Sequence, residues 1–284
     1  MLLAHLIVAQ PRNFNGMIVN NVRYSESAPL FELRDAAVQI AGRQILQPVT
    51  HTFTPGRVTG LIGHNGSGKS TLLSLLSRQN THHTGDILWQ KRPVTDWPSR
   101  EFARHVAYLP QQLPPAEGMT VKELVTLGRY AWHGALKRAS NEDMASVDEA
   151  INSVDLYWAS EHLVEQLSGG ERQRAWLAMC VVQASHCLLL DEPTSALDIA
   201  HQKEVLQVIH DLSRTRNLTV IMVLHDINMA ARFCDEFVAL RHGQTVFKGD
   251  AQALMTAEQL SAIYHVPMGV THPEPSLPPI SYVK

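Results

Sequence analysis

The chain has 284 residues, of which 45% are hydrophobic and 18% are charged, and its formal net charge is −3. This length and apolar content suffice for one large domain with a substantial core, and the slightly acidic balance, without a run of lysine or arginine, argues against a nucleic-acid partner. No stretch reaches about 18 consecutive apolar residues, so the sequence predicts no membrane-spanning helix.

The chain begins with a segment that shows no periodic pattern. Residues 1–30 predict a poorly ordered extension, and their short apolar start lacks the basic flank of a signal peptide. Alternating residues follow over Phe31–Phe53, with turns at Ala41–Gly42 and Pro55–Gly56. This pattern is typical of an antiparallel β-layer.

The next segment, GHNGSGKST, has the spacing of a phosphate-binding loop, G-x-x-x-x-G-K-[ST]. Apolar Val58–Ile62 before it predicts a buried strand and Ser70–Leu76 after it a helix, which is the context that this motif requires. Glycines let the backbone wrap around phosphates, and a helix N-terminus favours anions. The expected ATP-binding residues are Gly63, His64, Asn65, Gly66, Ser67, Gly68, Lys69, Ser70 and Thr71.

A helical pattern runs from about Gln112 to Leu167 and predicts an inserted helical subdomain, extending to about residue 180. At its end Ser168–Gly170 precede a further helix, so a serine hydroxyl and bare backbone N–H groups form a second anion site. One ATP needs only one phosphate-binding loop. This second site would therefore bind the γ-phosphate of a nucleotide held by a second copy of the chain. An ordinary serine-capped helix is the alternative.

Two carboxylates follow a short apolar run, Cys187–Leu190, that predicts a central parallel strand. Asp191 stands at the carboxyl end of that strand, where open α/β sheets bind ligands, and would hold Mg²⁺ together with Ser70. Glu192 points elsewhere and would act as general base on the attacking water.

The remaining elements are another apolar strand, Thr219–Leu224, and a final helix, Thr256–Tyr264. A lone histidine, His225, closes the strand, and residues 268–284 form a proline-rich tail. The other histidines are scattered without ligand spacing. Three cysteines, also without metal spacing, indicate buried and reduced thiols: Cys180, Cys187 and Cys234.

These segments together resemble the nucleotide-binding subunit of an ABC transporter, over roughly Phe31–Pro267. GHNGSGKS matches the Walker A motif, LSGGERQ the ABC signature and LLLDE the Walker B motif. Ser195–Asp198 matches the D-loop, His225 the switch histidine, and Gln111 in VAYLPQ the Q-loop glutamine. YLPQQLPPAEGMTVKELVTLGRY and LHDINMAARFCD are similar to the ATPase subunits of ferric hydroxamate uptake systems, within the family that imports iron chelates and vitamin B12.

The resemblance implies an α/β fold, in which residues 31–267 form a P-loop (RecA-like) parallel-sheet core with an antiparallel β subdomain and a helical subdomain inserted at about 112–180. It implies an ATPase that uses ATP and Mg²⁺. The implied catalytic residues are Lys69, Gln111, Glu192 and His225, and the implied Mg²⁺ ligands are Ser70, Gln111 and Asp191. Ser168, Gly169, Gly170, Glu171 and the D-loop residue Asp198 would act across a dimer.

The implied partners are a second copy, an integral-membrane permease and, indirectly, a periplasmic siderophore-binding protein, with the chain at the cytoplasmic face of the bacterial inner membrane. Residues from Gln111 to about Trp132 would contact the permease. We expect the cargo to be Fe(III)–hydroxamate siderophores, with another iron chelate, haem or vitamin B12 as alternatives. A non-transport ABC ATPase acting on DNA or ribosomes is a remote alternative, since the chain has neither long coiled coils nor a second such domain.

One position departs from the family pattern. An aromatic residue usually precedes the P-loop and stacks on adenine, whereas VQIAGRQIL places Ala41 at about that point. Arg43 could stack through its guanidinium plane. The sequence therefore predicts phosphate recognition but leaves base recognition open.

Overall fold

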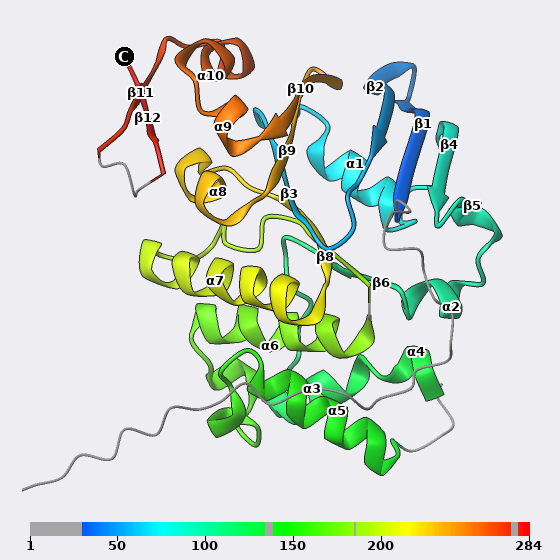
Figure 1. The fold of residues 1–284 in the computed structure, drawn as a ribbon. Coiled ribbons are helices and arrows are strands. Elements are labelled where there is room, and N and C mark those ends of the chain that lie inside the picture. Colours follow the sequence, from blue (N-terminus) through cyan, green and yellow to red (C-terminus); the bar gives the residue numbers. More distant parts are fainter. Residues whose placement is uncertain (1–29, 134–138, 185, 274–277) are drawn as a thin grey trace, which may run out of the picture.

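Two sheets organise the chain, one of six strands and one of four (Figure 1). The computed structural model describes residues 30–133, 139–184, 186–273 and 278–284. The expected N-terminal extension, residues 1–30, lies outside the described residues apart from Leu30.

The four-stranded sheet is antiparallel and has the order β2-β1-β4-β5. Its strands are β1 (Phe31–Ile40), β2 (Arg43–Thr52), β4 (Thr84–Trp89) and β5 (Arg92–Pro93). Ala41 and Gly42 both have positive φ angles, 48° and 78°, and form the two-residue turn between β1 and β2. The alternating pattern therefore predicts this antiparallel layer correctly.

The six-stranded sheet has the order β10-β9-β3-β8-β7-β6. Five strands run parallel, and β10 is antiparallel to β9. The strands are β3 (Val58–Ile62), β6 (Val106–Leu109), β7 (Cys187–Leu190), β8 (Thr219–Val223), β9 (Glu236–Arg241) and β10 (Gln244–Asp250). Strands β3 and β7 have the bounds that their apolar runs predict, because strands covered on both faces need continuous hydrophobic residues.

The two faces of this sheet pack into different cores. Along β7, Leu188 and Leu190 belong to a core shared with the helices, which we call the helical-side core. Cys187 and Leu189 point the other way, into a core shared with β1, β2 and α1 (Lys69–Leu76), which we call the strand-side core. This division follows from the period of two in side-chain direction along a strand.

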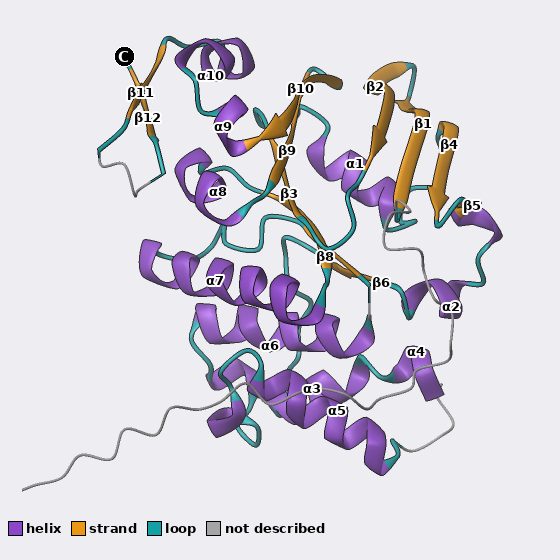
Figure 2. Cartoon of the chain, in the orientation of Figure 1, coloured by secondary structure: helices purple, strands orange, loops and turns teal. Residues whose placement is uncertain are grey.

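The helices gather mainly on the helical side (Figure 2). Described helices of the inserted segment are α3 (Val121–Leu127), α4 (Tyr130–His133), α5 (Asn141–Asn152) and α6 (Gly169–Gln183), with single turns at η2 (Tyr157–Ala159) and η3 (Val164–Gln166). They lie at the end of the molecule remote from β1 and β2 (Figure 1). Capping boxes begin α3, α5 and α6 at Thr120, Ser140 and Ser168.

The other helices connect successive strands along the chain. They are η1 (Val94–Asp96), α2 (Ser99–Ala103), α7 (Ile199–Arg216), α8 (Ile227–Phe233), α9 (Ala251–Leu254) and α10 (Ala257–Tyr264). Thr256 caps α10 by accepting the Gln259 N–H, so the helix begins one residue later than its pattern predicts.

The segment predicted only as a proline-rich tail contains two strands, β11 (Met268–Thr271) and β12 (Ile280–Val283), which pair antiparallel. Proline is rare inside strands, so the proline-rich composition of this segment argues against strands. Its four prolines, at positions 273, 275, 278 and 279, however, all lie between β11 and β12 and leave both strands free of proline.

The three cysteine thiols are buried and unpaired, as predicted. Burial raises the pKa of Cys180 to about 12 and raises the pKa values of Cys187 and Cys234 as well. Among the described residues, no helix is long and apolar enough to cross a bilayer.

Candidate active site

Four neighbouring parallel strands end at the same edge of the six-stranded sheet. Strand β3 leads into the P-loop, β8 to His225, β7 to Asp191 and Glu192, and β6 to Gln111. Since the strand order is β3-β8-β7-β6, the histidine leaves the sheet between the P-loop and the two carboxylates. The topology thus brings these residues to one ligand-binding edge.

The P-loop has a backbone that requires glycine at its first position. Gly63 has a φ of 133°, and a Cβ there would lie 2.1 Å from the carbonyl oxygen of Leu240 on β9. Gly68, with a φ of 103°, is the N-cap of α1. Any side chain at Gly63 would therefore force the loop away from β9 and the sheet edge.

Lys69 is buried at the start of α1, with its side chain folded back onto the loop. Its Nζ donates to the carbonyl oxygens of Gly63 and His64, at 2.8 and 2.7 Å. Burial lowers the pKa of Lys69, whereas the nearby charges of Glu192 and Asp191 raise it. The ammonium group therefore lies in the field of both carboxylates.

Asp191 is buried and is held by two hydroxyl groups. Ser70 Oγ donates to Oδ1 at 3.0 Å, and the Tyr108 hydroxyl lies 3.5 Å from Oδ2. Burial raises the pKa of Asp191, and the hydrogen bond from Ser70 opposes that rise. Burial, together with the charge of Asp191, raises the pKa of Tyr108 to about 12. Sequence reasoning missed Tyr108, although it lies in the VAYLPQ segment that ends at Gln111.

The oxygen atoms at this point fit a Mg²⁺ ion. A serine hydroxyl and an aspartate carboxylate oxygen lie 3.0 Å apart, and hard divalent cations prefer such oxygen ligands. The predicted third ligand, Gln111, contacts Glu192 in this structure, so its role at the metal stays a prediction.

Glu192 lies between two side chains from neighbouring strands. Gln111 Nε2 donates to Oε2 at 2.5 Å, and His225 Nε2 lies 2.5 Å from Oε1. Its own backbone has a φ of 49°, which is uncommon for a residue other than glycine and recurs at functional sites. The structure therefore brings Gln111, Glu192 and His225 into direct contact.

The predicted second anion site lies at the N-terminus of α6. Ser168 Oγ accepts the Glu171 N–H at 3.3 Å, and Glu171 Oε2 accepts the Ser168 N–H at 2.8 Å. These bonds lower the pKa of Glu171. Gly170 is packed so closely that a Cβ there would lie 2.8 Å from the ring of His201 on α7.

Asp198, from the predicted D-loop, caps the neighbouring helix α7. Asp198 Oδ1 accepts the backbone N–H of His201 at 3.0 Å. The same oxygen lies 2.8 Å from His201 Nδ1. These hydrogen bonds lower the pKa of Asp198. His201, which sequence reasoning missed, thus links Asp198 to the start of α6. The hydrogen bonds of Ser168 and Asp198 among the described residues remain within these two helix starts.

The other P-loop residues differ in their surroundings. His64 turns its ring toward α10, where Nε2 lies 2.7 Å from the carbonyl oxygen of Tyr264. Ser67 is buried, Asn65 is exposed, and Thr71 is half-buried on α1. Ala41 is exposed in the β1–β2 turn and offers no ring for a base.

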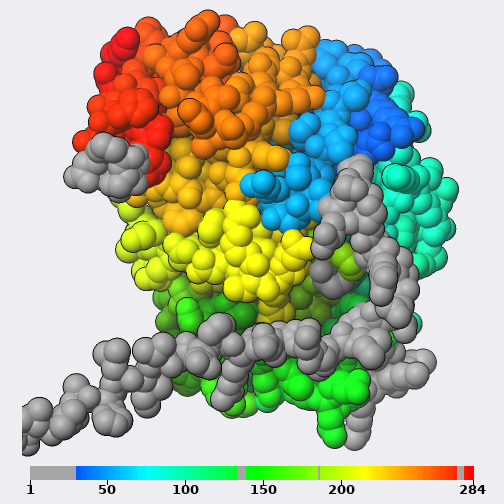
Figure 3. All heavy atoms as spheres, in the orientation of Figure 1, coloured from blue at the N-terminus to red at the C-terminus, as the bar shows by residue number. Residues whose placement is uncertain are grey.

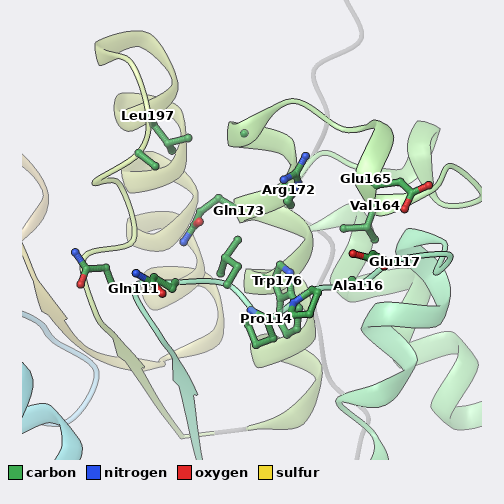
Figure 4. Close-up of a pocket in the computed structure, with 15 residues that line it drawn as sticks. Gln111, Pro114, Ala116, Glu117, Val164, Glu165, Arg172, Gln173, Trp176 and Leu197 are labelled. Carbon is green, nitrogen blue, oxygen red and sulfur yellow. The ribbon is translucent and has the colours of Figure 1, made fainter.

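A cavity of about 530 Å³ opens beside the site, between the segment after Gln111 and helix α6 (Figure 4). Its lining combines apolar and charged side chains, including those of Pro114, Glu117, Arg172, Trp176 and Leu197. Gln111 therefore borders both this cavity and Glu192.

Known proteins share both the sequence pattern and the fold. Residues 46–195, just over half of the chain, match the sequence profile described as ABC transporter. The iron(3+)-hydroxamate import ATP-binding protein FhuC of Bacillus subtilis is 37% identical over 79% of this chain and 83% of its own. The ferric enterobactin transport ATP-binding protein FepC of Escherichia coli is 38% identical over 78% and 81%.

A solved ATP-binding cassette of an ABC transporter, MJ1267 in its ADP conformation, has a TM-score of 0.75 to this structure. It is 17% identical, over 84% of this chain and 98% of that one, which shows the common fold. The family match, the close relatives and the strand-edge geometry agree. The chain belongs to the ABC transporter family, as an ATP-hydrolysing, ATP-binding subunit.

Proposed function

We propose that this chain hydrolyses ATP to drive the import of Fe(III)–hydroxamate siderophores through a permease in the bacterial inner membrane. The observation that carries the ATPase part is the meeting of the P-loop, Asp191, Glu192 and His225 at one edge of the parallel sheet. The cargo part rests on the 37% identity to a relative named for iron(3+)-hydroxamate import.

The triphosphate of ATP lies along Gly63–Thr71, with its negative charge balanced by Lys69 and the N-terminus of α1. Ser70 and Asp191, with Gln111 as the third ligand, would hold Mg²⁺. When bound, this ion would neutralise part of the negative charge of the phosphate groups. The buried ammonium of Lys69, near both carboxylates, supports this placement.

Glu192 orients the attacking water and accepts its proton, and the P–O bond to ADP breaks as the new P–O bond forms. His225 contacts the γ-phosphate and holds the transition-state geometry. The 2.5 Å contact between His225 Nε2 and Glu192 Oε1 supports a shared role for the two side chains.

Each site is completed by a second copy of the chain. Ser168–Glu171 would contact the γ-phosphate held by the partner, and Asp198 would reach across the same interface. The exposed Gly169 in the first turn of α6 supports this proposal, because the first N–H groups of a helix have no partner within the helix. A two-fold axis then makes both sites equivalent.

Import ATP-binding subunits of this family work with a membrane permease. We propose that the permease contacts the segment from Gln111 to about Trp132, with the 530 Å³ cavity as the recess that receives it. Because Gln111 touches Glu192, a change in the phosphate site can alter the wall of that recess. A periplasmic binding protein would deliver the siderophore on the other side of the membrane.

Gene deletion tests the cargo. Loss of the gene should abolish growth on ferrichrome as sole iron source and spare vitamin B12 uptake, and wild-type but not Lys69→Ala complementation should restore growth. If growth on ferrichrome survives while a catecholate, ferric citrate or haem can no longer be used, the hydroxamate assignment is wrong. The ATPase assignment would stand, because it rests on other observations.

A further inference from the structure

The C-terminal segment, in its described residues 257–273 and 278–283, makes polar contacts with the P-loop and with the helix that follows His225. It contains helix α10 and the β11–β12 hairpin. One contact joins α10 to the P-loop, and the other joins β12 to helix α8, which follows His225. In the space-filling view its red and orange residues cover one end of the molecule (Figure 3).

The contact with α8 consists of three hydrogen bonds between two residues. Ser281 donates its backbone N–H and its hydroxyl to Asn228 Oδ1, at 2.8 and 2.9 Å. Asn228 Nδ2 donates to the Ser281 carbonyl oxygen at 3.1 Å. Ser281 is buried and Asn228 is half-buried, so these bonds are partly shielded from water.

Helix α8 is joined to the switch histidine without a flexible linker. Asp226, the residue after His225, is the N-cap of α8 and accepts the N–H groups of Asn228 and Met229, at 2.8 and 2.9 Å. The backbone of Asn228 is therefore fixed to the cap that adjoins His225. On the N-terminal side of His225, strand β8 ends only two residues earlier, at Val223.

The hairpin is itself anchored to α10. Met268 N–H, on β11, donates to Ser261 Oγ, on α10, at 2.9 Å. Within the hairpin the two strands pack closely, since a Cβ at Gly269 would lie 2.3 Å from the ring of Tyr282 on β12. The last turn of α10 then reaches the P-loop, where the Tyr264 carbonyl oxygen lies 2.7 Å from His64 Nε2. Helix α10 and the two paired strands thus link the P-loop to the helix that follows His225.

We propose that Asn228 and Ser281 are positioning residues for ATP hydrolysis. Their hydrogen bonds hold α8, and with it His225, at a fixed place relative to the P-loop and Glu192. This inference rests on the proposed role of His225. Neither residue belongs to the expected ATP-binding loop, Gly63–Thr71, so their loss should disturb the geometry of the transition state more than the binding of nucleotide.

The test compares Asn228→Ala, which removes all three bonds, with Ser281→Ala, which removes only the hydroxyl bond. Asn228→Ala should lower kcat at least about tenfold while KM for ATP stays within about twofold, as expected for a small displacement of a reacting group. Ser281→Ala should lower kcat less. The double variant should be no worse than Asn228→Ala, because both changes break one contact. Asn152→Ala, at an exposed position on α5, is the matched control.

Three outcomes separate the inference from its premises. If His225→Ala hydrolyses ATP at the wild-type rate, the proposed role of His225 is wrong and the inference falls with it. If His225→Ala is inactive but Asn228→Ala keeps its kcat, only the inference is overturned. If Asn228→Ala does not fold, Asn228→Leu decides, since it keeps the bulk of the side chain and removes all three bonds; a wild-type kcat for this variant also overturns the inference.

Discussion

Replacing Glu192 by glutamine keeps the shape of the side chain but removes its capacity to take a proton. The carboxylate faces two nitrogen atoms, Gln111 Nε2 and His225 Nε2, each 2.5 Å away. A side-chain amide accepts through its carbonyl oxygen and donates through its NH₂ group, so it can still accept from Gln111. It can also donate to His225 if the imidazole adopts the other tautomer. The local geometry can therefore survive the substitution.

The expected loss is that of the general base alone. A positioned base contributes about 10²–10⁴-fold, which corresponds to about 3–5 kcal/mol of transition-state stabilisation. Glu192→Gln should thus bind ATP normally and lower kcat by at least about a hundredfold. It should also accumulate an ATP-bound dimer.

Phosphate release at saturating ATP gives kcat, and size-exclusion chromatography with ATP detects the dimer. Glu165→Gln, which removes a carboxylate from the wall of the neighbouring cavity, is the control for loss of charge and should keep its activity. Turnover of Glu192→Gln at the wild-type rate would remove Glu192 from the role of base.

Three further predictions concern other parts of the chain. Ser168→Arg should lower hydrolysis by about 10²-fold or more while leaving ATP binding to the monomer intact. Mixing it with Lys69→Ala chains should restore at best one working site per heterodimer, and full activity of Ser168→Arg alone would refute a shared site. GTP should support hydrolysis within about tenfold of ATP, because Ala41 lacks a stacking contact of about 1 kcal/mol; a hundredfold preference for ATP would contradict this. Burial lowers the pKa of His186 from 6.5 to about 4, so the unfolded chain binds more protons between these values, and stability should fall as pH drops through this window. Urea denaturation should show this fall, and His186→Gln should reduce it.

The sequence predicts the parallel-sheet core because the signals of its apolar strands are local. Strands β3 and β7 are short apolar runs, and the residues that follow them have residue types and spacing that few other functions require. The antiparallel layer is likewise visible from alternation and from a two-residue turn at Ala41–Gly42.

The contacts that sequence reasoning missed join residues far apart in the chain. Tyr108 and Asp191 are separated by 83 positions, His64 and Tyr264 by 200, and Asn228 and Ser281 by 53. No periodicity or motif marks such pairs, since only the packed fold brings them together. From the sequence alone, a hydroxyl, amide or imidazole side chain at these positions could equally be exposed to solvent or bonded within the fold.

Each strand of the parallel sheet belongs to both cores at once. Leu188 on β7 packs among the helices and Leu189 packs against the strand side, so neither layer can separate without exposing apolar surface of the other. We therefore expect the helical layer and the β-layer to unfold together, in one calorimetric transition, in spite of the chain's length. A truncated chain that lacks the inserted helices should aggregate rather than fold, because its sheet would present an uncovered hydrophobic face to water.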